Sequence, residues 1–377
     1  MAQLIVSNSP HLRTEEDIRS IMWTVVMMLI PAGLMGAVVF GWYAAFVTAL
    51  SVVTAAATEY VCQKVRRIPV TLGDGSAVLA GLLFAYVMPP NMPWYVAVIG
   101  ASAAILIGKQ IFGGLGCNIW NPALVGRAVV GAAYASATFL SKWPIIRNAA
   151  ASSAGGGWFS DRLAAIKSSF ANLAANINVD AVTQASPLYA VKTAAREGFT
   201  AHGVEINGNL ISNLPPGTTV SDIVHKCDIS YMNLFTGHQV GCIGETSAGL
   251  LLLGGIILIF LKIVDWRIPF VYILTVAALS WVLPLGECGW FAGDPLFSVL
   301  SGGLMIGAFF MATDMVTSPL TPKGKVIFAL GCGILTVIIR YYGGYPEGVC
   351  YSILLMNTAV PLIDRFCRPK KFGEVKA

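Results

Sequence analysis

Ten apolar segments of 17 to 21 residues dominate this sequence of 377 residues. They occupy residues 21–41, 43–61, 73–89, 94–112, 122–140, 246–263, 268–285, 295–312, 325–342 and 347–363. About 20 apolar residues in an α-helix cross the roughly 30 Å hydrocarbon core of a bilayer. The segments therefore predict an all-α polytopic membrane protein with ten transmembrane helices.

The composition argues against the water-soluble classes. Hydrophobic residues make up 56% of the chain and charged residues 11%, against roughly 25% charged residues in soluble domains. So few charges cannot cover a water-facing surface, which excludes a soluble enzyme and a nucleic-acid-binding protein. The eight cysteines include no CxxC or CxxH pair, and the four histidines lie outside the apolar segments. We therefore expect no metal site.

The distribution of Lys and Arg orients the predicted spans. With the N-terminus in the cytoplasm, the short outer connections contain no Lys or Arg. The basic residues lie in the inner connections, in the span ends that flank them and in the tail: Lys64, Arg66, Arg67, Lys109, Arg127, Lys262, Arg267, Lys323, Lys325, Arg365, Arg368, Lys370 and Lys371. Basic residues on the cytoplasmic side are the usual determinant of orientation. We predict a multi-pass protein of the bacterial cytoplasmic (inner) membrane with both termini in the cytoplasm.

The predicted spans divide the chain into five regions. A cytoplasmic segment, 1–20, precedes a first membrane unit of five spans, 21–140. An extracytoplasmic loop of about a hundred residues, 141–245, leads to a second unit of five spans, 246–363, and a cytoplasmic tail, 364–377. Long connections usually carry a function, so we expect a site in the loop rather than a spacer.

Five spans on each side of the loop predict two inverted repeats, because an odd number of spans reverses the second unit. Two matches support this register: residues 73–81 resemble 293–302, and residues 113–127 resemble 343–365 with small insertions. Their glycines favour interrupted helices that expose backbone groups to a ligand, with ordinary close helix packing as the alternative. The matches predict candidate sites at 113–122, inside, and at 343–348, outside.

Charged residues in or near the spans lie close to span ends: Glu59, Asp74, Lys109, Asp265, Asp314, Arg340 and Glu347. We expect most of these side chains to reach the membrane interface and remain solvated. Asp74 and Asp314 flank interrupted segments, which makes them candidates for an ion path.

One segment of the long loop carries a modification pattern. Residues 179–188, VDAVTQASPL, contain Asp-x-x-Ser/Thr-x-Ala-Ser/Thr followed by Pro-Leu. Ser-Pro alone is an ordinary turn signal. The full pattern resembles the acceptor site of the periplasmic flavin transferase, which attaches FMN through its phosphate to the last hydroxyl. The resemblance assigns the FMN phosphoester to Ser186 and recognition by the transferase to Asp180, Thr183 and Ala185.

Together with this motif, the ten spans, Ser9-Pro10-His11 and residues 118–122 (NIWNP) carry a wider resemblance. The whole chain resembles the family that contains RnfD of the Rnf complex and its counterpart NqrB of the sodium-pumping NADH:quinone oxidoreductase. It departs from the common family pattern at Ser186, where Thr is usual, and at Gln184, where Gly is usual. Serine still offers the primary hydroxyl that a phosphoester requires.

The resemblance also implies a second, non-covalent flavin. The family holds riboflavin in its membrane part, and Asn118 and Asn121 resemble the asparagines that contact it. Side-chain amides three residues apart on a helix can donate to and accept from an isoalloxazine edge. Capping of a helix that begins at Pro122 is the structural alternative.

The implied function is electron relay in a membrane complex. The resemblance suggests a flavoprotein component of a translocase, the Rnf ferredoxin:NAD oxidoreductase, which couples electron transport to Na⁺ or H⁺ transport. Its expected partners are Rnf subunits A, B, C, E and G, the flavin transferase during maturation, and lipid. The short N-terminal segment favours the Rnf branch over the quinone-reducing branch. A urea-channel-like passive transporter, which also uses inverted five-helix repeats, is the alternative from another class.

Overall fold

The computed structural model describes residues 17–134, 143–144, 183–184, 187–198, 204–206, 209–211, 214–215, 217–227, 229–237, 241–344 and 347–367. Each of the ten apolar segments contains helical residues. Within the described ranges, four helices are long and apolar enough to cross a membrane: α1 (Ile18–Phe40), α2 (Trp42–Val65), α15 (Pro322–Tyr342) and α16 (Val349–Phe366). The chain is an integral membrane protein, and the crossing of the membrane by all ten segments stays a prediction.

The first membrane unit contains α1, α2 and shorter elements that follow them. These are a 3₁₀ turn η1 (Leu72–Asp74), α3 (Ser76–Tyr86), α4 (Trp94–Ile105), a π-helical turn η2 (Leu106–Gln110) and α5 (Pro122–Ala133). Gly75 has a φ of 78°, in the left-handed region that favours glycine, and the Asp74 carboxylate accepts from the backbone N–H of Ser76 at 2.9 Å. Helix α3 therefore begins only at Ser76.

The second unit contains α11 (Ala248–Phe260), α12 (Arg267–Val282), α13 (Pro295–Leu300), α14 (Leu304–Ile306), a π-helical turn η4 (Gly307–Met311), α15 and α16. The apolar segment 295–312 is thus broken between α13 and α14, where Gly302 has a φ of 68°. Asp294 caps α13 by accepting from the N–H of Phe297 at 2.9 Å, and Pro295 occupies the first turn.

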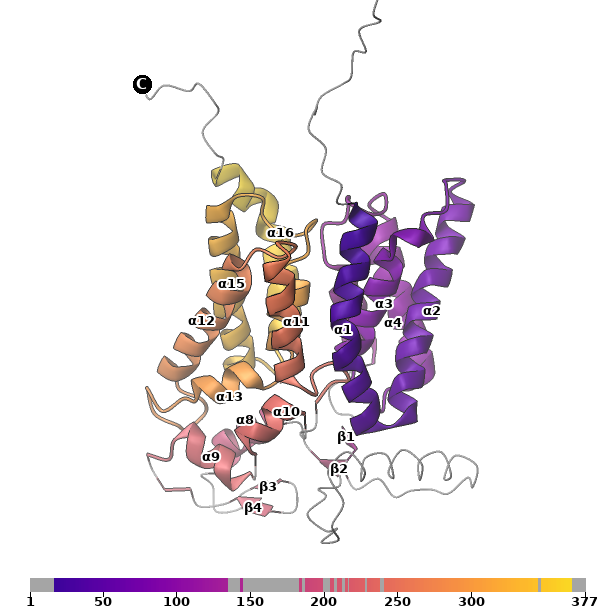
Figure 1. Ribbon diagram of the computed structural model, residues 1–377. Coiled ribbons are helices and arrows are strands. Elements are labelled where there is room, and N and C mark those ends of the chain that lie inside the picture. Colours follow the sequence, from indigo (N-terminus) through magenta and orange to yellow (C-terminus); the bar gives the residue numbers. More distant parts are fainter. Residues whose placement is uncertain are drawn as a thin grey trace, which may run out of the picture.

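The described parts of the long loop form short elements. They are β1 (Trp143–Pro144), β2 (Thr183–Gln184), α8 (Pro187–Glu197), β3 (Val204–Ile206), β4 (Asn209–Ile211), α9 (Val220–Lys226) and α10 (Tyr231–Thr236). Helices α8, α9 and α10 lie at one end of the helix bundle, whereas α1 begins and α16 ends at the other end (Figure 1).

Helix α8 is anchored to the second unit through its basic side chains. Lys192 donates to the carbonyl of Gly343, and Arg196 donates to the carbonyl of Tyr341, each at 2.7 Å. These carbonyls lie at the C-terminal end of α15, where the helix dipole favours cations. The contacts therefore hold α8 against the end of the bundle.

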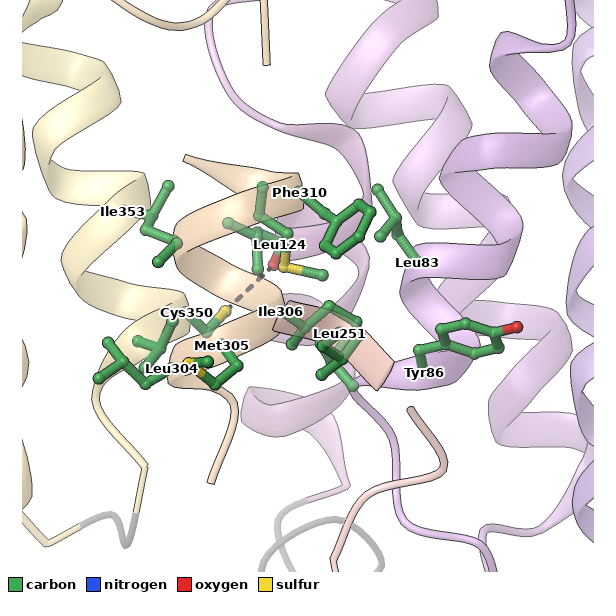
Figure 2. Close-up of a cluster of buried hydrophobic side chains, with 14 of the residues drawn as sticks. Leu83, Tyr86, Leu124, Leu251, Leu304, Met305, Ile306, Phe310, Cys350 and Ile353 are labelled. Carbon is green, nitrogen blue, oxygen red and sulfur yellow. Dashed lines mark hydrogen bonds between the residues drawn. The ribbon is translucent and has the colours of Figure 1, made fainter. Parts of the chain in front are cut away.

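The two units share one apolar core. Leu83 and Tyr86 of α3 and Leu124 of α5 lie in the same cluster as Leu251 of α11 and Ile306 of α14 (Figure 2). The chain before α11 adds backbone contacts across the interface, because the N–H groups of residues 243 and 244 donate to the carbonyls of residues 88 and 86 at 3.1 and 2.9 Å. This shared core holds the two membrane units together and so fixes the positions of the polar side chains on its borders.

Close helix crossings set the spacing inside the first unit. A Cβ atom added at Gly81 of α3 would lie 2.9 Å from the carbonyl oxygen of Ser51 and 2.9 Å from the Cβ of Ala55, both on α2. Only glycine permits this approach of two backbones.

We expect Gly81→Ala to destabilise the protein by about 1–3 kcal/mol, because the added methyl must separate α2 and α3. Unfolding of the purified protein in detergent, followed by circular dichroism, measures the change. Gly73→Ala is the matched control, since a Cβ added at Gly73 meets nothing within 4 Å. Equal losses of stability in the two variants would contradict the crossing argument.

Candidate functional site

A mostly apolar cavity lies where the two membrane units meet. The space between its protein atoms, part of which is open to solvent, amounts to about 760 Å³, and α1, α3, the π turns η2 and η4, the end of α11 and residues 113–122 contribute to its walls. Six polar side chains line it: Ser76, Lys109, Asn118, Asn121, Thr313 and Asp314. An apolar pocket with a few convergent polar groups is the usual form of a small-molecule site.

The glycines of residues 113–116 shape one wall of this cavity. Gly113, Gly114 and Gly116 have φ values of 124°, 112° and 90°, which lie in the region that side chains disfavour. The chain then folds back on η2, where a Cβ added at Gly108 would lie 2.7 Å from the Cα of Pro122. The glycine pattern thus marked a real interruption of the helices. The π turns had no signal in the sequence.

Asn121 links the two units. Its Oδ1 accepts from the N–H of Ala123 at 3.0 Å, which caps α5, and its Nδ2 donates to the carbonyl of Met311 at 3.2 Å, at the end of η4. The capping role considered for this residue is therefore present. Asn121 also satisfies a carbonyl that the end of the π turn leaves free.

Asn118 has a different environment. Its Nδ2 donates to the carbonyl of Trp120 at 3.3 Å, whereas its Oδ1 is buried and has no hydrogen-bond partner among the described residues. A buried acceptor without a partner is costly unless water or a ligand satisfies it. Asn118 therefore offers the cavity a free acceptor, while both ends of the Asn121 amide are in use.

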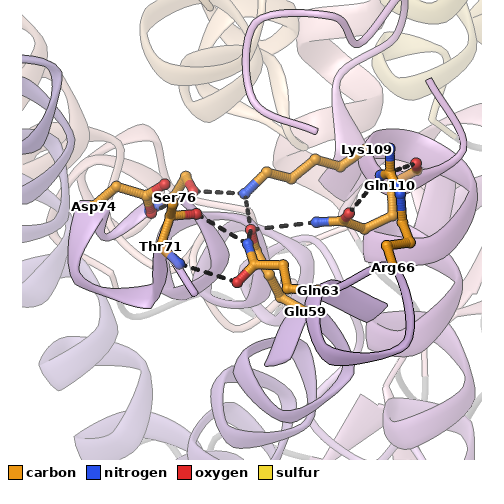
Figure 3. A network of polar contacts seen from close by, with 8 residues as sticks. All are labelled: Glu59, Gln63, Arg66, Thr71, Asp74, Ser76, Lys109 and Gln110. Carbon is orange, nitrogen blue, oxygen red and sulfur yellow. Dashed lines mark hydrogen bonds and ion pairs between the residues drawn. The ribbon is translucent and has the colours of Figure 1, made fainter. Parts of the chain in front are cut away.

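A buried ion pair forms the polar corner of the cavity (Figure 3). Lys109 Nζ lies 2.6 Å from Glu59 Oε1 and 2.6 Å from Ser76 Oγ, and the exposed fractions of the Lys109 and Glu59 side chains are 3% and 1%. Gln63 and Gln110 donate to the same carboxylate oxygen at 3.0 and 3.4 Å. Glu59 therefore has its own cation and two amide donors.

A second buried charge cluster lies nearer the end that carries α8. Arg127 of α5 forms an ion pair with Glu347, which precedes α16. Arg340 of α15 donates to the carbonyls of Ser298 and Ser301 at 2.7 and 3.1 Å. These carbonyls lie at the break between α13 and α14.

These findings correct the expectation of solvated charges at span ends. It is wrong for Glu59, Lys109, Arg340 and Glu347, because each side chain is buried or nearly buried and has a partner inside the protein. Lys109 and Arg127, which flank the inner connection at 113–121, are likewise buried, because η2 and α5 hold them in the interior.

The other predicted charges have different surroundings. Asp265 matches the expectation, because it is partly exposed and pairs with Lys325 and Arg267 at 2.9 and 3.2 Å. Of the two candidates for an ion path, Asp314 lines the cavity, whereas Asp74 accepts from the backbone N–H of Ser76 at the start of α3.

The predicted site at 343–348 contains Glu347, and the structure adds two neighbours that sequence reasoning missed. These neighbours are Cys242 and Glu245. The sulfur of Cys242 and one carboxylate oxygen from each of Glu245 and Glu347 all lie within 4.8 Å of one another. The sequence did contain a signal for Glu245, because this charged residue directly precedes the sixth apolar segment, 246–263.

The flavin-attachment motif is described only in part. Asp180, Ala185 and Ser186 lie outside the described residues. Thr183 belongs to β2, which pairs antiparallel with β1 so that Thr183 lies opposite Pro144. Helix α8 begins at Pro187, directly after Ser186.

Comparison with known proteins identifies the family. The sequence model of the NQR2, RnfD, RnfE family matches residues 5–373. The chain belongs to this family. The resemblance inferred from the motifs is thereby confirmed.

Curated relatives match almost the whole chain. It is 43% identical over 368 residues to the D subunit of the proton-translocating ferredoxin:NAD(+) oxidoreductase complex of Clostridium ljungdahlii, covering 98% of this chain and 96% of the relative. It is 41% identical over 375 residues to the D subunit of the Na(+)-translocating ferredoxin:NAD(+) oxidoreductase complex of Acetobacterium woodii, covering 99% and 96%. The names describe both relatives as parts of larger complexes.

We expect Lys109→Met to destabilise the protein by about 3–5 kcal/mol, because it leaves a buried carboxylate without its cation. The double variant Glu59→Gln/Lys109→Met should lose much less stability, since neither charge remains. Unfolding in detergent measures both. Lys325→Met, which removes a partly exposed pair, is the control and should cost less than about 1 kcal/mol. Additive losses in the double variant would refute the buried pairing.

Proposed function

We propose that this chain is the membrane electron-carrier subunit of a ferredoxin:NAD⁺ oxidoreductase complex that couples electron transport to H⁺ or Na⁺ transport. One observation carries the proposal: relatives with this activity in their names match 98% and 99% of the chain at 43% and 41% identity. The same matches favour the Rnf branch over the quinone-reducing branch of the family. No feature of the described residues favours a passive transporter.

The proposal includes ten spans in two inverted repeats. Corresponding contacts in the two units support it. Asp74 and Asp294 each accept a backbone N–H at the start of the third span of their unit. Lys109 and Arg340, near the end of the fourth span, each donate to the third span of the same unit. Trp23, near the start of α1, donates to the carbonyl of Gly73, so the contacts of the first unit lie near the start of α1. Helix α13 lies at the end that carries α8 to α10 (Figure 1), so the two sets of contacts lie at opposite ends of the bundle, as inversion requires.

The same arrangement supports the proposed regions and their sides. The beginning of α1 and the end of α16 lie at one end of the bundle, and α8 to α10 lie at the other (Figure 1). With the basic connections in the cytoplasm, region 141–245 is extracytoplasmic, and the segments 1–20 and 364–377 are cytoplasmic. The membrane units are 21–140 and 246–363, in the bacterial inner membrane.

The proposal places covalent FMN on Ser186. The motif of Asp180, Thr183 and Ala185 supports this assignment, as does the helix that follows. Helix α8 has eleven residues and no acidic residue in its first turn, and the N-terminus of such a helix favours an anionic phosphate. The anchored α8 would keep the attached flavin at the outer end of the bundle, with the flavin transferase as the partner that attaches it.

Riboflavin is the proposed occupant of the cavity between the units. The residues present fit it, because the walls are mostly apolar, include Phe309 and Phe310, and present the unsatisfied Oδ1 of Asn118. That oxygen can accept from an N–H on the edge of a flat ring system. Asn121 would act mainly by holding η4 in position.

The protein's own contribution is to hold, orient and exclude water. A bound flavin supplies one- or two-electron chemistry. Electrons reach and leave the bound flavins through partner subunits, because the relatives are components of larger complexes. We propose the Rnf subunits A, B, C, E and G as those partners, in a complex surrounded by lipid.

We predict that Ser186→Ala removes covalent FMN, because only the hydroxyl can form the phosphoester. Mass spectrometry of tryptic peptide 168–192 from the native membrane measures the modification. Ser168→Ala, in the same peptide but outside the motif, should keep it. Flavin that persists in the Ser186 variant would redirect the assignment to Thr183. An unmodified wild-type peptide would count against covalent attachment altogether.

We predict that Asn118→Ala lowers the content of acid-extractable riboflavin and leaves covalent FMN unchanged, since it removes a ligand contact and no helix cap. Asn121→Ala should lower riboflavin content and also cost about 1 kcal/mol of stability through the lost cap. Chromatography of the extracted flavin provides the measurement, with Asn233→Ala on α10 as the control. Full riboflavin content in the Asn118 variant would contradict this contact.

A further inference from the structure

Several unsatisfied polar atoms gather around the break between α13 and α14. Six buried side-chain polar atoms among the described residues have no hydrogen-bond partner, and four belong to Glu245, Thr246, Ser301 and Arg340. A Cβ added at Gly303 would lie 2.6 Å from Glu245 Oε1, and one added at Gly302 would lie 3.1 Å from the Arg340 guanidinium. Such groups require water or another polar ligand, because burial without one is costly.

A small cavity lies between the N-terminal end of α8 and this cluster. Its lining includes Pro187, Leu188, Glu245, Thr246 and Gly302, and the space that it encloses holds about one water molecule. Thr246 is 2% exposed and its hydroxyl has no partner among the described residues. The cavity thus combines apolar walls with the carboxyl of Glu245 and the hydroxyl of Thr246, and a water molecule held there can carry a proton between buried groups and solvent.

The charges around Glu245 leave it without a cation of its own within the described part of the chain. Arg127, from α5, forms an ion pair with Glu347, which precedes α16. Arg340, from α15, directs its terminal nitrogens to two carbonyls. Glu245 itself accepts the backbone N–H of Cys242, at 3.4 Å, through Oε2.

Burial and the nearby Glu347 carboxylate raise the pKa of Glu245 to about 8. Arg127 opposes this increase without cancelling it. Burial also raises the pKa of the Cys242 thiol, so the thiol stays protonated at neutral pH. Burial and the neighbouring carboxylate thus shift the pKa of the Glu245 carboxyl toward the neutral range.

We propose that Glu245 is a proton-binding site that exchanges its proton with the extracytoplasmic side through the cavity at the N-terminal end of α8. The inference rests on the proposed function only for which side of the membrane is outside.

A proton fits this site better than a metal cation does. Glu347 already has Arg127 as its counter-ion, and a second guanidinium group lies close by. The remaining neighbour is a thiol, which is a poor ligand for hard cations such as Na⁺. A proton neutralises Glu245 without needing further ligands, and water in the cavity can deliver it.

Infrared difference spectroscopy of the full-length protein in its native membrane complex tests the proposal. A pH titration in H₂O and D₂O should show the C=O band of a protonated carboxyl group, shifted in D₂O, that disappears with a midpoint near pH 8. Glu245→Gln should lack this band. Glu347→Gln should lower the midpoint, because it removes a negative charge and frees Arg127 to stabilise the Glu245 carboxylate. Glu287→Gln, at an exposed glutamate, is the control and should change neither.

Three results would overturn the proposal: a band that persists in Glu245→Gln, a midpoint that does not move in Glu347→Gln, or a band removed at constant pH by NaCl and not by KCl. The last result would identify a sodium site instead. The Glu347 variant keeps the test usable if Glu245→Gln fails to fold. Covalent flavin, measured on the same samples, separates this test from the proposed function, because the band does not depend on flavin.

Discussion

Broken helices in a membrane protein release backbone carbonyls that the hydrocarbon cannot satisfy, and this requirement organises the structure. The break between α13 and α14 leaves the carbonyls of Ser298 and Ser301 facing the interior, and Arg340 donates to both. At the end of η4 the carbonyl of Met311 has no partner within the helix, and Asn121 of the other unit donates to it. Each interruption therefore brings a polar side chain into the core.

The two units meet through these same polar groups. Asn121 reaches from α5 to η4, and Arg127 reaches from α5 to Glu347. Backbone contacts of residues 243 and 244 with the end of α3 add a third connection. Both cavities lie next to these contacts, so a ligand or proton bound in either one is positioned to affect how the units fit together. The apolar core between them supplies adhesion but little specificity.

The sequence predicted the positions of the helices well, because the length of an apolar run and the glycines that interrupt it are local properties. Capping of α5 by Asn121 before Pro122 was also readable locally. The pairing of charged side chains could not be predicted from local sequence. Glu59 and Lys109 are 50 residues apart, and Arg127 and Glu347 are 220 apart. Only the packed helices decide whether such a side chain faces lipid, water or a partner. The expectation of solvated charges failed for this reason.

The two buried clusters show how one constraint gives two chemical outcomes. Each contains a glutamate with one unsatisfied carboxylate oxygen, in Glu59 and in Glu245. Lys109 lies 2.6 Å from Glu59 and supplies this carboxylate with a counter-ion. At Glu245 the nearby arginines are already engaged, by Glu347 and by the carbonyls at the helix break. Arg340 donates to the carbonyls that the helix break leaves free, and it therefore does not pair with Glu245. A carboxylate left in this position can lower its energy by binding a proton, and the need to satisfy backbone carbonyls is what creates a titratable group there.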